Sequence, residues 1–407
     1  MREIDLVTDQ QTSSSRIRVL FVIGTMGGGG AERQVVEILK RLDRTRFEPF
    51  LYLAMKQGEL LSDVPADVPI HAFWDGHPEP LSRRILRWLK LTRIVRYAHL
   101  AHVLRELKID IVYDRTYLAT LDSAGGCFLR PTPRISCCVV EPEPELLLHA
   151  RISKGFSWWF ARRAYASADV VLANSQGLRN RMIEYFKLDP DRVRVLYNLL
   201  TNISDPNLAD QPTRSAVSGQ PFLIVSSGRL HPQKGQIYLL QAILDLVKHQ
   251  NRAVRLVLLG QGESESLLRD FIRTHDLQSN VELAGFVSNA EQWYRQADLF
   301  VLSSLYEGMP NSLIEAVACG APALSTDCPS GPFEILDGGQ CGRLVPPADS
   351  AALASAIADA MDHREEWMAR AELARKRVLE LFDPQAGIQR LEQLLEQTAK
   401  TKSSPIV

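Results

Sequence analysis

Short apolar runs alternate with stretches of helical periodicity along most of this chain, and this alternation limits the folds open to it. The first run, residues 17–23, ends near a cluster of glycines, and the stretch after it has the apolar stripe of an amphipathic helix. Similar runs follow at residues 50–54, 109–113, 135–140, 170–173, 222–226, 254–259, 281–284, 299–302 and 322–325. Strands that alternate with helices predict βαβ units and a mainly parallel sheet, and therefore an α/β fold.

The alternation stops at residues 201–220, which are rich in Pro, Asn, Ser and Gly and are predicted to be an interdomain linker. Residues 222–228 then repeat the opening pattern of a strand and a glycine loop. We expect a disordered leader at residues 1–15, an N-terminal domain at 16–200 and a second domain at 221–382. Two similar Rossmann-like domains would face each other across a cleft, and the remaining residues, 383–407, continue the helical pattern and form the tail.

Charge and cysteine usage narrow the functional classes. The net charge of −1 argues against general nucleic-acid binding, which needs an excess of basic residues. The six cysteines form no Cys-x-x-Cys pair, so we expect buried free thiols in a reducing cytoplasm. The first residues do not look like a signal peptide, and no uncharged run is long enough to span a bilayer. The expected location is the cytoplasm or the cytoplasmic face of a membrane.

Two glycine-containing turns follow the first strand of each predicted domain. Residues 27–30 are four consecutive glycines before the first helix, where a backbone free of Cβ atoms and a helix N-terminus suit an anion. The spacing fits neither a Rossmann dinucleotide fingerprint nor a P-loop. In the second domain, Arg229 and Lys234 lie between Gly228 and Gly235, and this cationic pair suits a diphosphate.

The most specific motif is a pair of carboxylates eight residues apart. Glu307 lies on a loop after the strand at residues 299–302, and Glu315 lies in the first turns of a short helix that Asn311 or Ser312 could cap. The amides of residues 309–313 are expected to point into the same cleft. Two carboxylates beside such amides can hold sugar hydroxyls while the amides and the helix dipole face phosphate.

In this order, these motifs resemble the family 4 retaining glycosyltransferases with the GT-B fold, over residues 17–382. Three further segments carry the resemblance: Asn174-Ser175, residues 195–198, which end in Asn198, and Thr326-Asp-Cys-Pro-Ser-Gly-Pro332. The last is similar to motifs of bacterial enzymes that build lipopolysaccharide, capsule or lipid-linked oligosaccharides. The resemblance implies that a C-terminal helix at residues 385–398 crosses back to the N-terminal domain. It also implies a retaining hexosyltransferase that uses a nucleotide sugar and needs neither a cofactor nor a metal.

The resemblance also assigns roles to individual residues. Arg229 and Lys234 would neutralise the leaving diphosphate, Glu307 would contact the donor sugar, and Glu315 would hold the ribose hydroxyls. Gly29 and Gly30 would contact the diphosphate, and the backbone at Phe286 and Val287 would read the base, most often uracil. The other donor-binding candidates are Met309, Pro310, Asn311, Ser312 and Leu313.

One position departs from the family pattern. Many relatives have a His after the strand that here spans residues 135–140, whereas this chain has Glu141-Pro-Glu143-Pro-Glu145. Acids between prolines are more typical of an exposed loop than of a catalytic group. Glu141 could instead take a polar role near the sugar, and Arg115, which follows the strand at residues 109–113, is a further candidate for the acceptor side of the cleft. Asp189-Pro-Asp191 is interpreted as a turn and not as a metal ligand.

Residues 83–96 alternate arginines and lysine with large apolar side chains, which fits either a helix on an anionic membrane or a core helix with a basic surface. The aromatic residues 156–160 could extend such a surface or line an acceptor groove. The leading hypothesis is sugar transfer from a UDP-sugar to a saccharide acceptor, lipid-linked in one version, during cell-envelope glycan synthesis. The alternatives are a nucleotide-sugar epimerase with the same architecture and a non-catalytic subunit that binds the nucleotide sugar as a scaffold.

Overall fold

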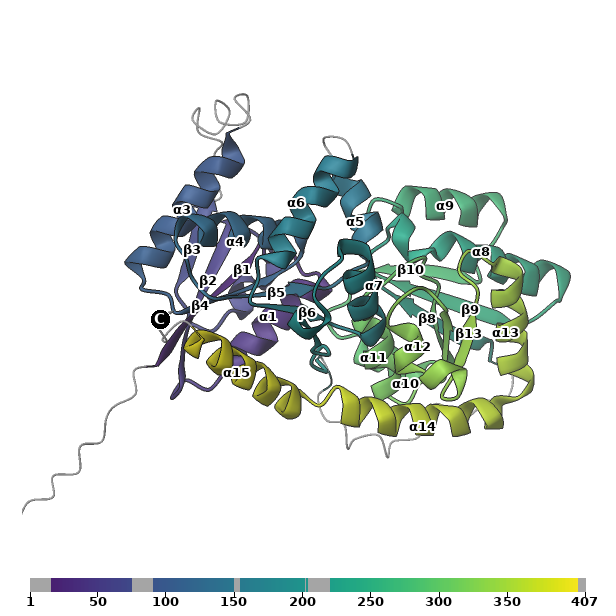
Figure 1. The fold of residues 1–407 in the computed structure, drawn as a ribbon. Coiled ribbons are helices and arrows are strands. Elements are labelled where there is room, and N and C mark those ends of the chain that lie inside the picture. Colours follow the sequence, from purple (N-terminus) through teal and green to yellow (C-terminus); the bar gives the residue numbers. More distant parts are fainter. Residues whose placement is uncertain (1–15, 75–90, 150–153, 202, 204–219, 402–407) are drawn as a thin grey trace, which may run out of the picture.

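The computed structural model describes residues 16–74, 91–149, 154–201, 203 and 220–401. The chain forms two α/β domains side by side, joined along one edge by the C-terminal helices (Figure 1). Each domain has one parallel sheet, so the predicted α/β class with two Rossmann-like domains is confirmed.

The first sheet has seven parallel strands in the order β3-β2-β1-β4-β5-β6-β7. The strands are β1 (Ile17–Ile23), β2 (Phe47–Met55), β3 (Ile70–Trp74), β4 (Ile111–Arg115), β5 (Arg134–Cys138), β6 (Val170–Ala173) and β7 (Val193–Val195). Its helices are α1 (Gly30–Arg41), α3 (Thr92–Glu106), α4 (Tyr117–Leu129), α5 (Pro142–His149), α6 (Lys154–Ala166) and α7 (Gln176–Phe186). The central strands are buried on both faces, which explains why they read as continuous apolar runs.

The second sheet has six parallel strands in the order β10-β9-β8-β11-β12-β13. They are β8 (Phe222–Ser227), β9 (Val254–Leu259), β10 (Val281–Gly285), β11 (Leu299–Leu302), β12 (Ala323–Thr326) and β13 (Arg343–Val345). Helices α8 (Gln236–Leu244), α9 (Glu265–Thr274), α10 (Glu291–Gln296), α11 (Asn311–Ala318), α12 (Pro332–Ile335) and α13 (Ser350–Asp362) belong to this domain. Apolar clusters fill both sides of the sheet, with Leu258 on one side and Phe300 on the other.

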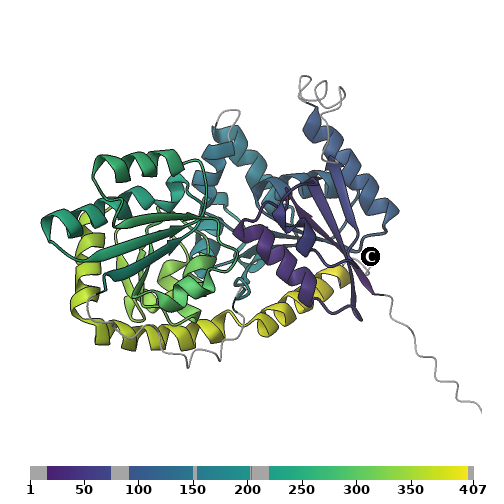
Figure 2. The same ribbon diagram turned by 180° about the vertical axis from the view of Figure 1, so that it is seen from behind.

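Two helices carry the chain back to its beginning. Helix α14 (Arg364–Leu381) runs along the second domain, and α15 (Pro384–Lys400) continues under the first, as Figures 1 and 2 show from opposite sides. Ile388, Leu391 and Leu395 of α15 enter the core of the N-terminal domain. The crossing helix implied by the resemblance is therefore present. Because β1 and β8 both end at the side that faces the other domain, the carboxyl edges of the two sheets meet.

The predicted leader, residues 202 and 204–219 of the predicted linker, and residues 83–90 of the basic stretch lie outside the described residues. The turn at Asp189 is confirmed, since its carboxylate accepts a hydrogen bond from the amide of Asp191 at 3.1 Å. The prediction of an exposed loop after β5 is wrong. Residues 142–149 form α5, and Glu141 is only 2% exposed.

Candidate active site

A cavity of about 470 Å³ lies between the two domains, at the carboxyl edges of both sheets. The first domain lines it with the turn after β1 and with Arg115, Asn174 and Asn198, and the second with the loops after β8, β9, β10 and β11. In parallel α/β sheets, ligands bind at this edge because the loops there are free to vary. Thirteen of the predicted site residues line this one cavity: Gly29, Gly30, Arg115, Arg229, Lys234, Phe286, Val287, Glu307, Met309, Pro310, Asn311, Ser312 and Glu315.

The glycine turn of the first domain opens directly into the cavity. Gly28 has a left-handed backbone with φ of +84°, and Gly29 is the N-cap of α1 without a side chain to cap it. The first amides of α1 therefore have no side-chain partner at the cap and can receive an anion. A Cβ at Gly29 would lie 3.5 Å from Nη2 of Arg229, in the opposite domain. The turn and this arginine thus face the same small volume.

The basic turn of the second domain is rigidly built. His231 accepts a hydrogen bond from the amide of Gln233 at 3.1 Å and so caps the short helix at Pro232–Lys234. Gly235 is left-handed, and a Cβ there would lie 2.1 Å from the carbonyl oxygen of Ser303. This packing fixes Lys234 next to the loop that carries Glu307. Among the described hydrogen bonds and ion pairs, none engages the guanidinium of Arg229.

Glu307 is nearly buried and already has two partners. Its Oε1 lies 2.5 Å from Nζ of Lys234 and accepts a hydrogen bond from Ser304 at 2.6 Å. The side chain of Glu307 is 7% exposed and that of Lys234 is 20% exposed. Burial raises the pKa of Cys328, which lies close to Glu307, so the thiol stays neutral beside this carboxylate. The lysine that is predicted to bind phosphate is thus paired with the carboxylate that is predicted to bind sugar.

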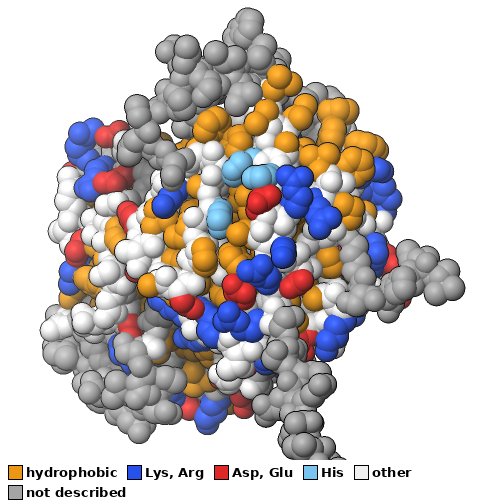
Figure 3. Space-filling view, turned by 90° about the vertical axis from the view of Figure 1, so that its left-hand side faces the viewer, with side chains coloured by type: hydrophobic (Ala, Val, Ile, Leu, Met, Phe, Trp, Pro, Cys, Tyr) orange, Lys and Arg blue, Asp and Glu red, His pale blue; other side chains and the backbone are white. Residues whose placement is uncertain are grey.

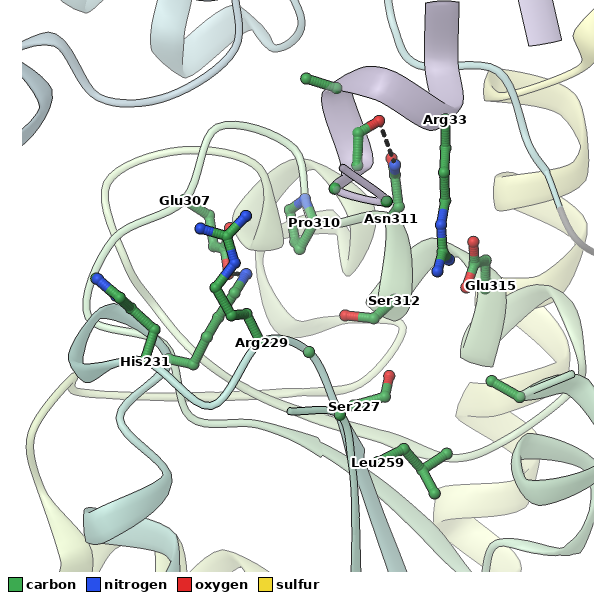
Figure 4. A pocket seen from close by; sticks show the side chains of 18 of the residues that line it. Arg33, Ser227, Arg229, His231, Leu259, Glu307, Pro310, Asn311, Ser312 and Glu315 are labelled. Atoms are coloured by element: carbon green, nitrogen blue, oxygen red, sulfur yellow. Dashed lines mark hydrogen bonds and ion pairs between the residues drawn. The ribbon is translucent and has the colours of Figure 1, made fainter. Parts of the chain in front are cut away.

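Glu315 lies on α11, deeper along the same wall. Its Oε1 accepts a hydrogen bond from Thr201 at 3.3 Å, and Figure 4 shows its carboxylate beside the guanidinium of Arg33 from α1. Tyr294 lies nearby and donates or accepts a 2.6 Å hydrogen bond with Ser227. Burial raises the pKa of Tyr294 well above its usual range, so this phenol stays neutral. Glu315 and Ser227 therefore offer oxygens to hydroxyl groups at one end of the cavity.

A chain of hydrogen bonds among residues that line the cavity joins the domains. Arg115 donates to Oδ1 of Asn198 at 2.6 Å, and Asn198 donates to Oδ1 of Asn311 at 2.7 Å and to the carbonyl of Met309 at 3.2 Å. Asn311 in turn donates to the carbonyl of Gly30 at 3.4 Å. The prediction that Asn311 or Ser312 caps α11 is wrong, because the N-cap is Pro310 and its side chain cannot accept a hydrogen bond. Asn311 is instead used to bridge the domains.

Two predicted site residues do not reach the cavity. The side chain of Leu313 is fully buried in the core, and its amide donates to the carbonyl of Pro310 at 3.1 Å. Glu141 accepts a 2.5 Å hydrogen bond from Ser330 of the second domain and pairs with Arg181 at 3.4 Å. In the structure it joins the two domains through a buried contact and does not line the cavity.

Comparisons with known proteins agree with this geometry. Residues 28–200 match the family model "Glycosyltransferase Family 4", and residues 221–363 match the model "Glycosyl transferases group 1". Together the two models span most of both domains, with the region of the predicted linker between them.

The chain belongs to the family 4 and group 1 glycosyltransferases.

Its fold is that of GT-B glycosyltransferases. HepE from Anabaena, solved in complex with UDP-glucose, superposes with a TM-score of 0.75 at 21% identity, covering 94% of this chain and all of HepE. Sucrose-phosphate synthase from Thermosynechococcus elongatus superposes equally well at 17% identity, covering 95% of this chain and all of the synthase. Similarity at this level shows the fold alone.

Relatives in sequence are also glycosyltransferases. An N-acetylgalactosamine-N,N'-diacetylbacillosaminyl-diphospho-undecaprenol 4-alpha-N-acetylgalactosaminyltransferase of Campylobacter jejuni is 28% identical over 79% of this chain and 84% of its own length. An uncharacterized glycosyltransferase of Methanocaldococcus jannaschii is 31% identical, but over only 42% of this chain and 43% of the relative.

Several residues that line the cavity of this glycosyltransferase were not predicted from the sequence to be site residues. Asn174, at the start of the Asn-Ser segment, is 2% exposed and lines the cavity, and its Oδ1 has no hydrogen-bond partner among the described residues. Asn198 also belongs to a segment that carried the resemblance, and Arg33 lies three residues after the glycine turn; both line the cavity. The signal was a polar residue directly after a buried strand, which often marks a site in α/β folds. The sequence did not show which residue each of these side chains contacts across the cleft.

Neither a metal site nor a membrane span is found in the described residues. No group of three or more His, Cys, Asp or Glu side chains within residues 16–401, where described, is arranged to hold a metal ion. In the same portion of the chain, no helix has the length and apolarity needed to cross a bilayer.

Proposed function

We propose that this glycosyltransferase moves a hexose from a UDP-sugar to a saccharide acceptor with retention of anomeric configuration, without a metal ion. The acceptor would be a lipid-linked glycan of the cell envelope. Support for this acceptor comes from two relatives of Campylobacter jejuni whose names describe substrates on diphospho-undecaprenol. Support for a UDP donor comes from solved complexes of similar fold that contain UDP or UDP-glucose.

One observation carries the proposal. Arg229 and Lys234 reach the cavity from one domain, and the N-terminus of α1, with Gly29 and Gly30, reaches it from the other. Cations and helix-start amides that converge on one volume are a site for a diphosphate. Glu307 and Glu315 flank this volume, so hydroxyl-bearing groups would lie on both sides of the bound diphosphate.

The reaction follows from this placement. The acceptor hydroxyl oxygen bonds to the anomeric carbon of the donor while the bond from that carbon to the β-phosphate oxygen breaks. The electron pair goes to the leaving UDP, and the hydroxyl proton passes to a phosphate oxygen on the same face. Arg229 and Lys234 stabilise the charge that develops on the diphosphate, which is the main contribution that electrostatics can make to such a step.

The two carboxylates have positioning roles in this mechanism. Glu315 and its neighbours bind the ribose hydroxyls, and the backbone at Phe286 and Val287, where β10 ends, binds the uracil. Glu307 holds a hydroxyl of the donor sugar. When the diphosphate arrives, Lys234 exchanges its carboxylate partner for phosphate oxygens, so donor binding releases Glu307 to the sugar.

We place the enzyme at the cytoplasmic face of a membrane, where its donor and a lipid-linked acceptor would meet. All six cysteines are free thiols, which suits a reducing compartment.

The test is release of UDP from a panel of UDP-sugars with envelope glycan acceptors, in the presence of EDTA. We expect acceptor-dependent release by the wild type, and a fall of about a hundredfold or more in Arg229→Ala and Glu307→Gln. Full activity in both variants would contradict the proposal. Donor isomerisation without acceptor would indicate the epimerase alternative, and UDP binding without any turnover would indicate the scaffold. NMR assignment of the product's anomeric configuration then tests retention.

A further inference from the structure

Large apolar side chains are exposed on four helices of the N-terminal domain. They are Leu91, Ile94 and Val95 at the start of α3, Leu118 at the start of α4, Leu147 near the end of α5, and Phe156, Trp159 and Phe160 in the first half of α6. We call these eight residues the apolar tip surface. Ile94 is 61% exposed, and Phe156, Trp159 and Leu147 are each nearly half exposed. Such exposure of neighbouring large apolar groups marks an interaction surface.

The topology places these residues at one edge of the domain. In a parallel sheet a helix that directly follows a strand begins near the carboxyl end of that strand, so α4 and α5 begin at the edge that carries the cavity, and α6 follows α5. Helices α3 and α4 are packed together at Arg96 and Asp122, which form a 2.8 Å ion pair. Helices α5 and α6 form a hairpin, and Figure 1 shows this hairpin and α3 projecting in the same direction.

Figure 3 shows the outer face of this domain, with hydrophobic side chains gathered in its upper part and Lys and Arg side chains beside them. The ring of Phe160 contacts those of Phe156 and Trp159, with centroids 4.7 Å and 5.1 Å apart. Trp158, by contrast, points inward and donates to the carbonyl of Tyr185 at 3.0 Å. The outward aromatic residues are therefore a separate feature and do not complete the core.

The charges on these helix starts are mostly basic. Arg93 and Arg163 are exposed, and the Arg163 guanidinium lies 5.7 Å from the Trp159 ring centroid. Helix α6 contains no acidic residue, and neither do the first two turns of α3. Of the acids on α5, Glu143 lies 3.9 Å from Arg181, and Glu145 is half-buried. Basic side chains around exposed Trp, Phe, Ile and Leu fit the interface of an anionic bilayer.

We infer that the apolar tip surface docks on an anionic phospholipid membrane. The occupant is a bilayer and not a partner helix, because the side chains come from four separate helices with basic side chains beside them, which suits a broad anionic surface. This docking would turn the cavity edge of the N-terminal domain toward the lipid. The inference rests on the proposed function for its purpose, since a lipid-linked acceptor would then be presented at that edge.

The experiment is cosedimentation of the full chain with vesicles of phosphatidylcholine, with and without phosphatidylglycerol. The test variant combines Ile94→Asp and Trp159→Asp. The matched control combines Phe128→Asp and Leu129→Asp, which alters two exposed apolar residues at the opposite end of α4. We expect the test variant to bind anionic vesicles about tenfold more weakly and the control to bind as the wild type does. Arg93→Glu with Arg163→Glu should weaken binding only to the vesicles that contain phosphatidylglycerol.

Equal binding by the test and control variants, or no binding by the wild type, would overturn the inference. A second measurement avoids any folding defect of the double variant, because it uses the wild type and the single variant Trp159→Phe. Vesicles of brominated lipid should quench part of the tryptophan fluorescence of the wild type, and this quenched part should be absent from Trp159→Phe. UDP affinity and UDP release with a water-soluble acceptor should be the same in all variants. If the wild type binds vesicles but releases no UDP with any donor and acceptor, the proposed function is refuted, whereas the inference that the apolar tip surface docks on a membrane is supported.

Discussion

At the scale of single residues, the contact between Lys234 and Glu307 is the one that most changes the interpretation of the motif. From the sequence, the glutamate and the lysine were assigned to sugar and phosphate separately. In the structure they are 2.5 Å apart and only slightly exposed. The two opposite charges satisfy each other, so a diphosphate must compete with the carboxylate for the lysine.

This competition predicts that Glu307→Gln separates binding from turnover. The neutral amide holds Lys234 less strongly, so the affinity for UDP should stay the same or increase, while UDP release from the sugar donor falls about a hundredfold. Calorimetric titration with UDP and a turnover assay on one preparation provide both values. A parallel loss of UDP affinity would mean that Glu307 is needed to build the nucleotide site.

Asn174 gives a second prediction at this scale. Its Nδ2 donates to the carbonyl of Val139 at 3.3 Å, whereas its Oδ1 is buried at the cavity without a described partner. A substrate hydroxyl that donates to Oδ1 would satisfy this atom. Asn174→Ala should lower kcat/KM for the transfer about three- to tenfold and leave UDP affinity unchanged, as expected for one lost hydrogen bond. Asn180→Ala, on an exposed part of α7, is the control and should have no effect.

At the scale of elements, the loop between β11 and α11 fits against the N-terminal domain without room for a side chain. A Cβ at Gly308 would lie 2.0 Å from the carbonyl oxygen of Val139 and 3.0 Å from Oδ1 of Asn174. Because the first of these atoms is backbone, it cannot move aside cheaply. The glycine after Glu307 therefore permits the two domains to touch at the cavity.

Gly308→Ala should accordingly hold the domains apart, reduce transfer sharply and lower the free energy of unfolding by about 1–3 kcal/mol. Gly24→Ala is the matched control, since a Cβ there meets nothing within 4 Å. Small-angle scattering and thermal unfolding would report the two effects. Normal transfer by Gly308→Ala would show that the contact with Val139 is not needed for activity.

Elements also show how far the sequence could predict the structure. The central strands were found because both of their faces are buried, as at residues 254–259, where the predicted and observed bounds agree. The strands β3, β7 and β13 were missed, and each is an edge strand with partly exposed residues and no continuous apolar run. The glycine and basic turns were identified by their place after a first strand. The pairings across the cleft, such as Asn198 with Asn311, depend on the packing of two domains, and no local pattern specifies them.

At the scale of the whole molecule, α15 connects the second domain to the first by packing against the first domain. Besides its apolar contacts, Glu392 accepts a hydrogen bond from the amide of Asp43 at 2.9 Å and pairs with Arg46, which also pairs with Glu396. The N-terminus of α7 adds a second tie, because the amides of Gln176 and Gly177 each donate to Glu334 of the second domain at 2.8 Å. The relative position of the two sheet edges, and therefore the shape of the cavity, depends on these contacts between the domains.

Leu391→Ala should therefore weaken the N-terminal domain, since this side chain is 1% exposed in its core. We expect a loss of about 2–5 kcal/mol, seen in calorimetry as a lower melting transition, together with weaker UDP binding. Leu373→Ala on α14, where the leucine is 58% exposed, should leave both unchanged. An unaltered transition in Leu391→Ala would mean that the N-terminal domain does not need α15.

The central claim is that Arg229 and Lys234, together with the glycine turn, bind a nucleotide diphosphate without a metal ion. Calorimetric titration of UDP in EDTA tests it most directly, on the wild type, Arg229→Ala and Arg255→Ala, the last an exposed arginine paired with Glu282 outside the cavity. We predict binding in EDTA by the wild type and Arg255→Ala, and affinity about tenfold or more lower in Arg229→Ala. Binding that requires a divalent cation, or equal affinity in all three proteins, would contradict the account.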